Sequence, residues 1–210
     1  MQLVNKELVE ILSKSIDLPE PVYEFGSFRV EGQEEFADLR PFFPNKEYIG
    51  CDAREGLGVD KVLDIHSIDI ETNSVGSIIC IDTLEHVEFF WKGVEEFHRI
   101  LKEDGVLLLT SVMKFPIHDH PSDYWRFTPE AFRSLTKKFP LQMIYCIGEP
   151  TFPTVVSAIC FNNPINSLKE QELRRELDSW KKKWDKKILR DYYLELAKEP
   201  LRKILKSSKS

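Results

Sequence analysis

SIICIDTLEHVEFFWKGVEEFHRILKEDGVLLLTSV, residues 77–112, decides the fold. Its two ends, 77–82 and 105–112, are short and continuously apolar, which predicts two buried strands. Between them, apolar residues recur every three or four positions over 87–101, and this spacing predicts an amphipathic helix. Asp104-Gly105 predicts a turn before the second strand. A strand, a helix and a strand in this order form a unit whose two strands run parallel.

The same alternation of strands and helices continues on both sides of this unit. Further strands are expected at 22–25, 48–52, 61–64, 141–147 and 155–161, and further helices at 3–15, 33–43 and 128–139. The last two strands have no helix between them, so they form a hairpin. The predicted fold class is α/β, a Rossmann-like three-layer sandwich with a mostly parallel seven-stranded sheet and one antiparallel edge strand.

Composition indicates one globular domain followed by a basic segment. The chain has 210 residues, of which 42% are hydrophobic and 30% charged, enough for a sizeable core. Its formal charge is -6, but residues 168–210 contain 14 Lys/Arg and 8 Asp/Glu, which leaves 15 basic and 27 acidic residues before them. Such an acidic body disfavours nucleic acid as a partner. We therefore expect the α/β domain with its N-terminal helix at 1–165, and a basic amphipathic helix at 166–210.

Cysteine usage and the lack of targeting patterns predict a cytoplasmic protein. Cys51, Cys80 and Cys160 lie within apolar, strand-like runs, so buried thiols are expected rather than a disulfide framework. No signal peptide pattern begins the sequence, and no apolar run is long enough for a membrane span.

Polar residues follow four consecutive predicted strands. In an open parallel sheet, ligands bind beyond the carboxyl ends of the strands. The residues found there are Glu24, Gly26 and Ser27 after the first strand, Asp52 after the second, Asp64 and Ile65 after the third, and Asp82, Leu84, Glu85 and His86 after the fourth. The sequence therefore predicts a single binding site at this edge of the sheet.

This ordered set resembles the type-11 family of class I S-adenosylmethionine (SAM)-dependent methyltransferases, over residues 21–161. In that family the first strand ends in an E-x-G-x-G-like loop, an acidic residue after the second strand binds the ribose hydroxyls, and an Asp after the third approaches the adenine amine. Glu24 with Gly26, Asp52 and Asp64 match these positions. The family's L-E-H and R-x-L-K-x-x-G motifs are matched by residues 84–86 and 99–105.

The resemblance implies an enzyme with SAM as its cofactor. It assigns cofactor binding to Glu24, Gly26, Ser27, Asp52, Asp64, Ile65, Asp82, Leu84 and His86. The chemistry is consistent, because a carboxylate such as Asp52 can accept two hydrogen bonds from a ribose diol. An acidic cleft attracts the sulfonium cation, and Gly26 permits close backbone approach by the methionine part.

The glycine loop departs from the family pattern. Phe28 and Val30 stand where the family has its second and third glycines. Arg29 is expected to pair either with the SAM carboxylate or with Glu31 or Glu34 in solvent. The departure motivates a second hypothesis, in which the protein is a non-catalytic member of the fold that binds a partner through its C-terminal helix. A nucleotide-dependent reductase is disfavoured, because no G-x-G-x-x-G follows the first strand.

Residues 115–128 follow the strongest predicted strand and should overhang the cleft. They resemble an H-x-x-P-x-D-Y-W-R-F-T stretch found in a subset of the family, at a position where family members usually contact the acceptor. His118 and His120 are the candidate general bases, because a neutral imidazole accepts protons near pH 7. Asp123 is the candidate orienting partner, and Tyr124 and Arg126 are candidates for binding the acceptor.

Structural interpretations stand beside these functional ones. Asp123, Tyr124 and Arg126 alternatively form a hydrogen-bond network that pins the loop, while Trp125 and Phe127 are expected to pack into the core rather than bind substrate. Asp82 is either a site residue or a solvent-facing loop residue. His86 either faces the sulfonium or caps the following helix. No metal site is expected, because the two loop histidines with Asp123 lack a helix-based ligand spacing.

The tail carries an apolar stripe at helical spacing. Its members are Leu173, Leu177, Trp180, Trp184, Ile188, Tyr192 and Leu196, with lysines on the opposite face. The stripe is expected to pack on the body, with a homodimer contact or a membrane surface as alternatives. Pro200 is expected to stop or kink the helix. The function predicted overall is methyl transfer from SAM to an oxygen or nitrogen of a small molecule or glycan.

Overall fold

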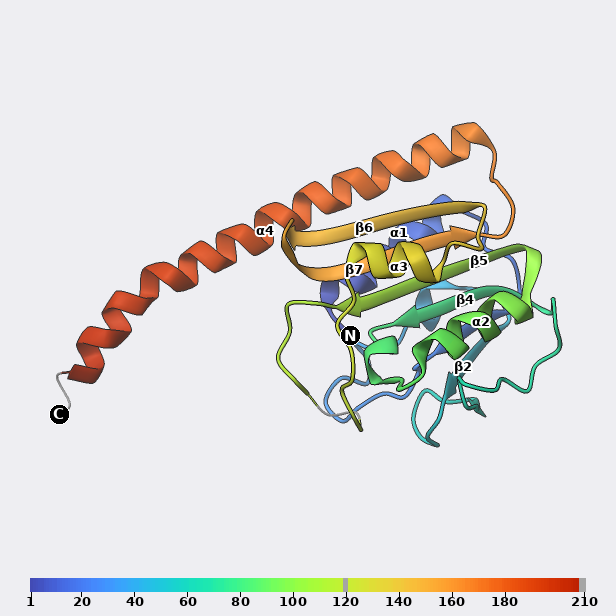
Figure 1. Ribbon diagram of the computed structural model, residues 1–210, viewed down its shortest axis with the longest axis horizontal. Coiled ribbons are helices and arrows are strands. Elements are labelled where there is room, and N and C mark those ends of the chain that lie inside the picture. Colours follow the sequence, from blue (N-terminus) through green and yellow to red (C-terminus); the bar gives the residue numbers. More distant parts are fainter. Residues whose placement is uncertain (119–120, 208–210) are drawn as a thin grey trace.

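A computed structural model describes residues 1–118 and 121–207, with side chains through Leu194 and at Lys198. It consists of one seven-stranded sheet with helices on both faces (Figure 1). The helices are α1 (Leu3–Ser15), α2 (Phe90–Ile100), α3 (Pro129–Leu135) and α4 (Ser167–Ser207), with short 3-10 turns η1 (Arg40–Phe42) and η2 (Leu84–His86). The strands are β1 (Val22–Phe25), β2 (Tyr48–Asp52), β3 (Lys61–Val62), β4 (Val75–Ile81), β5 (Leu101–Val112), β6 (Leu141–Glu149) and β7 (Phe152–Phe161).

The strand order is β3-β2-β1-β4-β5-β7-β6. Strand β1 pairs in parallel with both β2 and β4, whereas β7 is antiparallel to β5 and to β6. This confirms the predicted α/β class with a mostly parallel seven-stranded sheet. The antiparallel strand lies one place in from the edge, because the β6–β7 hairpin folds back so that β7 pairs with β5 and β6 becomes the edge strand.

Alternate residues along the central strands supply two separate cores, because successive side chains of a strand point to opposite faces. Ile79 and Ile81 of β4 join the core beneath α1 and α4. Ile78 and Cys80 of the same strand join the core beneath α2 and α3. This two-sided burial explains why the strand is apolar at every position rather than at every second one.

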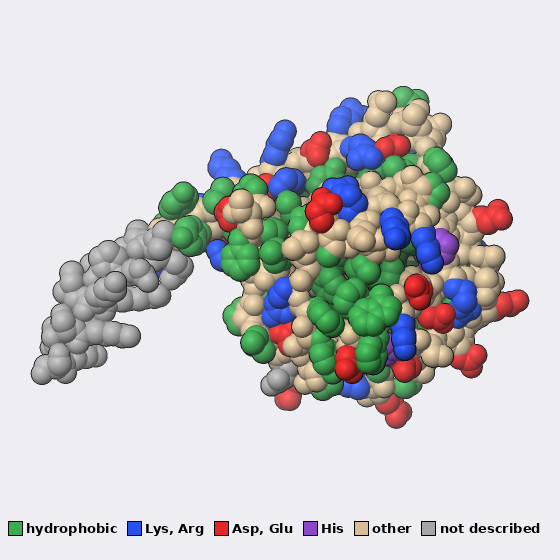
Figure 2. All heavy atoms as spheres, in the orientation of Figure 1, with side chains coloured by type: hydrophobic (Ala, Val, Ile, Leu, Met, Phe, Trp, Pro, Cys, Tyr) green, Lys and Arg blue, Asp and Glu red, His purple; other side chains and the backbone are tan. Residues whose placement is uncertain are grey.

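Helix α4 packs on the body through the first part of its apolar stripe. Leu173, Leu177, Trp180 and Trp184 are buried in the core shared with α1, and Ile188 packs against it. The interpretation that the stripe covers the body is thus confirmed for these residues. Beyond Ile188 the helix extends away from the sheet (Figure 1), and several basic side chains lie along the exposed side of α4 where it crosses the body (Figure 2). The side chain of Leu196 lies outside the described part of the chain.

The predicted helix at 33–43 is wrong. Only the three-residue turn η1 forms there. Pro41 lacks a backbone donor, and its ring clashes with the carbonyl four residues earlier in an α-helix. Instead, the carbonyl oxygen of Phe36 accepts a hydrogen bond from Lys6 Nζ at 2.7 Å, which ties this segment to α1 as a loop.

Several local boundaries also differ from the sequence prediction; α3, for example, ends at Leu135 rather than near residue 139. Asp104-Gly105 lies within β5 as a register irregularity, because Val75 pairs with Leu101 while Ser77 pairs with Val106. Helix α4 continues through Pro200 to Ser207, so this proline does not stop the helix. Helix α3 is capped at its N-terminus, since Thr128 Oγ1 accepts a hydrogen bond from the Ala131 amide at 3.1 Å. Among the described residues, no helix is both long and apolar enough to cross a membrane.

Candidate functional site

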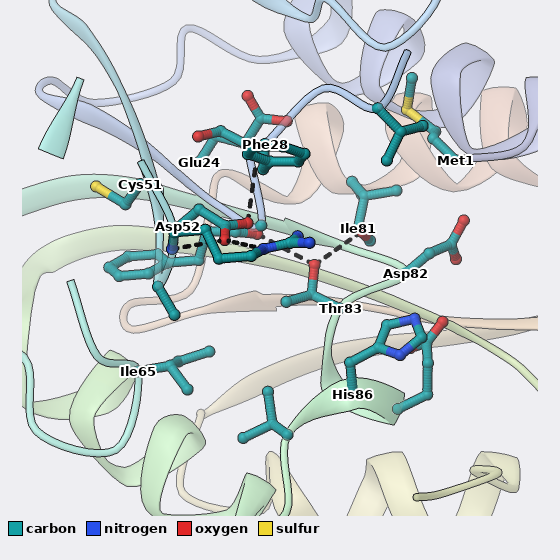
Figure 3. A pocket seen from close by; sticks show the side chains of 18 of the residues that line it. Met1, Glu24, Phe28, Cys51, Asp52, Ile65, Ile81, Asp82, Thr83 and His86 are labelled. Atoms are coloured by element: carbon teal, nitrogen blue, oxygen red, sulfur yellow. Dashed lines mark hydrogen bonds and ion pairs between the residues drawn. The ribbon is translucent and has the colours of Figure 1, made fainter. Parts of the chain in front are cut away.

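A cavity of about 440 Å³ opens at the carboxyl ends of β1 to β4 (Figure 3). It lies at the switch point of the sheet, where the strand order reverses between β1 and β4. The predicted site residues that line it are Glu24, Gly26, Ser27, Asp52, Asp64, Ile65, Asp82, His86 and His118. Residues from five separate segments therefore meet here, as expected from their positions after the predicted strands.

The turn after β1 depends on glycine at position 26. Gly26 has φ of +87°, a conformation that L side chains rarely adopt. A Cβ at this position would also fall on the side chain of Thr83, which is anchored to the Ile81 carbonyl at 2.9 Å. The absence of a side chain therefore allows the β1 loop to lie directly against the end of β4, and sequence analysis missed the contribution of Thr83.

Asp52 ends β2 with its carboxylate almost fully buried at the cavity wall. Its Oδ1 accepts hydrogen bonds from the Arg54 amide at 3.0 Å and from Arg54 Nε at 3.1 Å. The Arg54 guanidinium in turn lies over the ring of Phe28, 4.3 Å from its centroid. Figure 3 shows Phe28 beside Asp52, and the Phe28 amide donates a hydrogen bond to Asp52 Oδ2 at 3.4 Å. Sequence analysis did not identify Arg54, because nothing in the local pattern pairs it with the Phe28 ring.

The altered glycine loop is held by the neighbouring segment after β2. The amides of Gly26 and Ser27 both donate to the Cys51 carbonyl, at 2.8 and 3.0 Å. Arg29 forms an ion pair with Asp38 at 2.5 Å. The structure therefore gives Arg29 a protein partner other than the Glu31 and Glu34 considered from the sequence.

Asp64 and Ile65 follow β3 on the same side of the cavity. Asp64 Oδ1 accepts hydrogen bonds from the His66 amide at 2.9 Å and from His66 Nδ1 at 2.7 Å. These hydrogen bonds, the backbone one foremost, lower the pKa of the Asp64 carboxyl. His66 also lines the cavity. Ile65 adds an apolar side chain to the cavity wall (Figure 3).

Asp82 is held in an unusual backbone conformation at the end of β4. Its φ is +47°, which is uncommon for a residue other than glycine. Nδ2 of the fully buried Asn5 lies within hydrogen-bond distance of both carboxylate oxygens, at 2.8 and 2.9 Å, and Thr110 Oγ1 donates at 3.0 Å. These contacts fix the carboxylate at the cavity wall, so Asp82 is not a solvent-facing loop residue.

Glu24 is a buried carboxyl at the end of β1. It lies at the cavity wall and accepts a hydrogen bond from Tyr48 Oη at 2.7 Å. Burial is the main cause that raises the pKa of Glu24 to about 7, and the Tyr48 hydrogen bond opposes it. The wall of the cavity thus combines several carboxyl groups with few cations, which suits a positively charged ligand.

Glu85, His86 and His118 form one corner of the cavity. Glu85 is fully buried, and its Oε2 accepts a hydrogen bond from Ser111 Oγ at 2.8 Å. Burial, followed by the charge of Asp82, raises the pKa of Glu85 to about 8. The two imidazole rings meet edge to face with their centroids 4.7 Å apart. The sequence places Glu85 at this edge of the sheet but assigns it no part in binding the cofactor or the acceptor.

His86 does not cap α2. It ends η2, and its Nδ1 lies 2.6 Å from the Ser122 carbonyl oxygen of the loop that follows β5. This contact joins the end of β4 to that loop and leaves the ring facing the cavity (Figure 3). Leu84, by contrast, is fully buried in the core beneath α2 and α3, and its side chain is not part of the cavity wall.

The loop after β5 is pinned by a network around Asp123. The carboxylate is buried and binds Arg126 through two contacts of 2.5 and 2.7 Å, while the His118 amide donates to it at 2.9 Å. Arg126 also donates to the Pro116 carbonyl at 2.9 Å. The side chain of Arg126 therefore serves the loop itself, as the structural interpretation predicts, and it does not line the cavity.

Tyr124 and Trp125 of this loop lie outside the cavity, whereas Phe115 lines it. Tyr124 donates its amide to the Glu85 carbonyl at 2.8 Å, while its side chain is half-exposed. Trp125 is also partly exposed, which corrects its expected place in the core, because its Nε1 donates to the Glu88 carbonyl at 3.1 Å on the surface. His120 lies outside the described residues.

Comparison with known proteins agrees with this geometry. Residues 44–109 match a family model described as a methyltransferase domain. No curated protein matches the chain. Several solved structures share the fold at low sequence identity. A SAM-dependent methyltransferase from Thermotoga maritima aligns with a TM-score of 0.52 and 16% identity, over 77% of this chain and 92% of that one.

Two further solved structures are informative for their bound partners. The 1,6-didemethyltoxoflavin-N1-methyltransferase from Burkholderia thailandensis, with bound 1,6-didemethyltoxoflavin and S-adenosylhomocysteine, aligns with a TM-score of 0.53 and 16% identity, over 76% and 79% of the two chains. A methyltransferase from Haloferax volcanii in complex with the Trm112 activator aligns with a TM-score of 0.54 and 14% identity, over 78% and 90%.

The fold and the switch-point cavity, together with these matches, define a class of enzyme. Residues 44–109 match a methyltransferase domain, and the chain shares the fold of SAM-dependent methyltransferases. The methyl donor of this class is SAM.

Proposed function

We propose that the protein transfers the methyl group of SAM to an oxygen or nitrogen atom of a small molecule or a glycan. The observation that carries this proposal is the acidic cavity at the switch point, where residues after β1 to β4 meet the loop that follows β5. The small-molecule ligand of the Burkholderia methyltransferase supports an acceptor of this size. The four free cysteines support a reducing, cytoplasmic environment.

The donor lies along the strand ends. Asp52 takes the ribose hydroxyls, and Asp64 with Ile65 takes the adenine. Support comes from Figure 3, in which Asp52 and Ile65 lie on the side of the cavity opposite to Asp82 and His86. The methionine part then passes Gly26, where a backbone without Cβ permits close approach. Glu24, Ser27 and Asp82 supply acidic or hydroxyl groups around the methionine part of SAM. Leu84 supports the cavity wall from the core.

The acceptor reaches the methyl group from the corner that contains His86 and His118. Methyl transfer is an in-line displacement, in which the acceptor atom attacks the methyl carbon, the carbon–sulfur bond breaks, and sulfur retains the electron pair as S-adenosylhomocysteine. Alignment supplies much of the rate. A hydroxyl acceptor also loses a proton, and we assign this step to His118, whose Nδ1 lies 3.1 Å from Asp123 Oδ2. His120 is an alternative base, and Tyr124 and Arg126 are proposed acceptor contacts at the rim.

Calorimetric titration with SAM and S-adenosylhomocysteine tests the donor site. We expect micromolar binding of both ligands to the wild-type protein. Asp52→Ala should weaken binding by about tenfold or more, because it removes charge-assisted hydrogen bonds to the ribose. Asp69→Ala is the matched control, since Asp69 is exposed and lies outside the cavity. Absence of binding by the wild type would contradict the proposal and favour a non-catalytic protein that binds a partner through α4.

A further inference from the structure

We propose that Glu85, His86 and His118 form a binding site for a single divalent transition-metal ion of the Zn²⁺ type. One ligand atom from each of these side chains can be chosen so that all three lie within 4.8 Å of one another. Two imidazoles and one carboxylate form a ligand set suited to Zn²⁺ or Fe²⁺, which leaves one or more coordination positions open for another molecule. All three residues line the cavity, so these open positions face the space where an acceptor would bind.

The contacts of Nδ1 in both rings support this assignment. Nδ1 of His86 faces the Ser122 carbonyl at 2.6 Å. Nδ1 of His118 faces the Asp123 carboxylate at 3.1 Å and the Pro116 carbonyl at 3.2 Å. Because each of these partners is an acceptor, Nδ1 carries the proton in both rings, and Nε2 is the nitrogen with the lone pair. Metal-binding histidines are held in this way, with the non-ligating nitrogen donating to a carbonyl or carboxylate.

Glu85 supplies an independent observation. Its carboxyl is fully buried, and while Oε2 accepts from Ser111, Oε1 has no hydrogen-bond partner among the described residues. A buried carboxyl oxygen without a hydrogen-bond partner is costly, and native structures rarely leave one unexplained. A cation at this corner of the cavity would satisfy Oε1, while Ser111 continues to orient the other oxygen.

The corner has to close slightly to coordinate an ion. Ligand atoms lie about 2.1 Å from Zn²⁺, which places neighbouring ligand atoms about 3.4 Å apart in a tetrahedral site. Glu85 and His86 are fixed on η2, whereas His118 belongs to the irregular loop after β5 and is partly exposed. The His118 ring therefore makes the required movement, guided by Asp123.

This inference rests on the proposed function and changes one detail of it. With the ion bound, Nε2 of His118 is a ligand rather than a base, and an acceptor hydroxyl occupies an open position on the ion. A divalent ion lowers the pKa of a bound hydroxyl, so its proton passes to solvent water. The acceptor oxygen then attacks the methyl carbon of SAM as described above.

Metal titration of the untagged full-length protein, previously dialysed against a chelator, tests the site without any SAM. Co²⁺ is the spectroscopic probe, because its visible absorption reports coordination by nitrogen and oxygen ligands, and Zn²⁺ competition with calorimetry gives stoichiometry and affinity. We expect one ion per chain, and about 100-fold weaker binding in both His118→Gln and His86→Gln. His66→Gln is the matched control, because His66 also lines the cavity beside a carboxylate but lies outside the proposed ligand set.

The outcomes separate this inference from the proposed function. No Co²⁺ spectrum up to millimolar metal, or a spectrum that His118→Gln and His86→Gln leave unchanged, would overturn the metal site. Binding lost equally in His66→Gln would also overturn it, because the ion would then lie elsewhere in the cavity. SAM binding by the metal-free protein tests the donor site alone, so either proposal can fail while the other stands. Glu85→Gln is a third variant, and circular dichroism verifies its fold before titration.

Discussion

At the scale of single residues, Glu24 has a carboxyl whose protonation is coupled to folding. Burial raises its pKa from 4.5 to about 7, while Tyr48 and the more distant Arg40 and Arg29 lower it and Asp38 raises it. The folded protein therefore binds this proton more tightly than the unfolded chain does. The stabilisation is fully present below pH 4.5, and it is lost as the pH rises through 7. The loss amounts to about 3 kcal/mol, because a tenfold difference in proton affinity corresponds to roughly 1.4 kcal/mol.

Urea unfolding of the wild type and of Glu24→Gln at pH 5 and pH 8 measures this coupling. The neutral amide cannot ionise, so the variant should become more stable relative to the wild type by about 2.5 kcal/mol between the two pH values. Other titrating groups cancel in the difference. Parallel pH dependence of the two proteins would show that Glu24 is ionised in the folded state.

Gly26 and Gly32 offer a matched pair of glycines with positive φ. A Cβ at Gly32 would meet no atom within 4 Å, whereas at Gly26 it would collide with Thr83. Gly32→Ala should therefore lower the free energy of unfolding by only about 1 kcal/mol, the cost of an L side chain in the left-handed region. Gly26→Ala should lose about 2 kcal/mol more through the collision and should bind SAM more weakly. Equal effects of the two substitutions in urea unfolding and calorimetry would contradict the role given to Thr83.

The acidic residues of the site could be predicted from the sequence because of their positions at the ends of predicted strands. A carboxyl residue directly after a buried parallel strand, such as Asp52, has its position fixed by the strand that precedes it. Thr83, Arg54 and Glu85 could not be assigned in this way. Their roles depend on which segment lies opposite, for example the Phe28 ring beneath Arg54, and this information is tertiary.

At the scale of elements, the loop between β5 and α3 depends on the Asp123–Arg126 ion pair. The Asp123 carboxylate is only 2% exposed, so removing its partner leaves a buried charge without compensation. Arg126→Met should lower the free energy of unfolding by about 2–3 kcal/mol. It should also speed proteolysis within residues 113–128. Arg126→Lys retains the charge but not the two-pronged contact, and we expect an intermediate loss. Unchanged protease resistance of Arg126→Met would contradict this role.

Elements whose signal is local were predicted well, and those that depend on distant contacts were not. Strands β1 and β2 begin and end where their apolar runs do, and α1 spans the predicted 3–15. The segment at 33–43 has helical spacing, but Pro41 and the contact from Lys6 keep it a loop. The position of β7 between β5 and β6 also required knowledge of how the hairpin folds back onto the sheet.

At the scale of the whole molecule, α4 completes the core on one face of the sheet. Trp180 is among the largest fully buried side chains, and its Nε1 donates to the Val4 carbonyl of α1 at 3.2 Å. Trp180→Ala should lower the free energy of unfolding by about 3–5 kcal/mol. Trp91→Ala is the control for loss of an indole, since Trp91 is 42% exposed, and it should change stability by about 1 kcal/mol or less. Similar losses in the two variants would contradict a structural role for α4.

The last part of α4 stands apart from the core. Tyr192, Tyr193 and Leu194 are exposed, and the Lys114 ammonium above the Tyr192 ring, at 5.0 Å, is a contact that links this part of the helix to the body. A cation–π contact at an exposed site contributes about 0.5–1 kcal/mol. Deletion of residues 190–210 should therefore change the free energy of unfolding by no more than about 1 kcal/mol and leave SAM affinity unchanged. Thermal unfolding and calorimetry measure both quantities. A larger loss of stability that depends on protein concentration would mean that this segment packs against a second copy of the chain, because only an intermolecular contact makes stability depend on concentration.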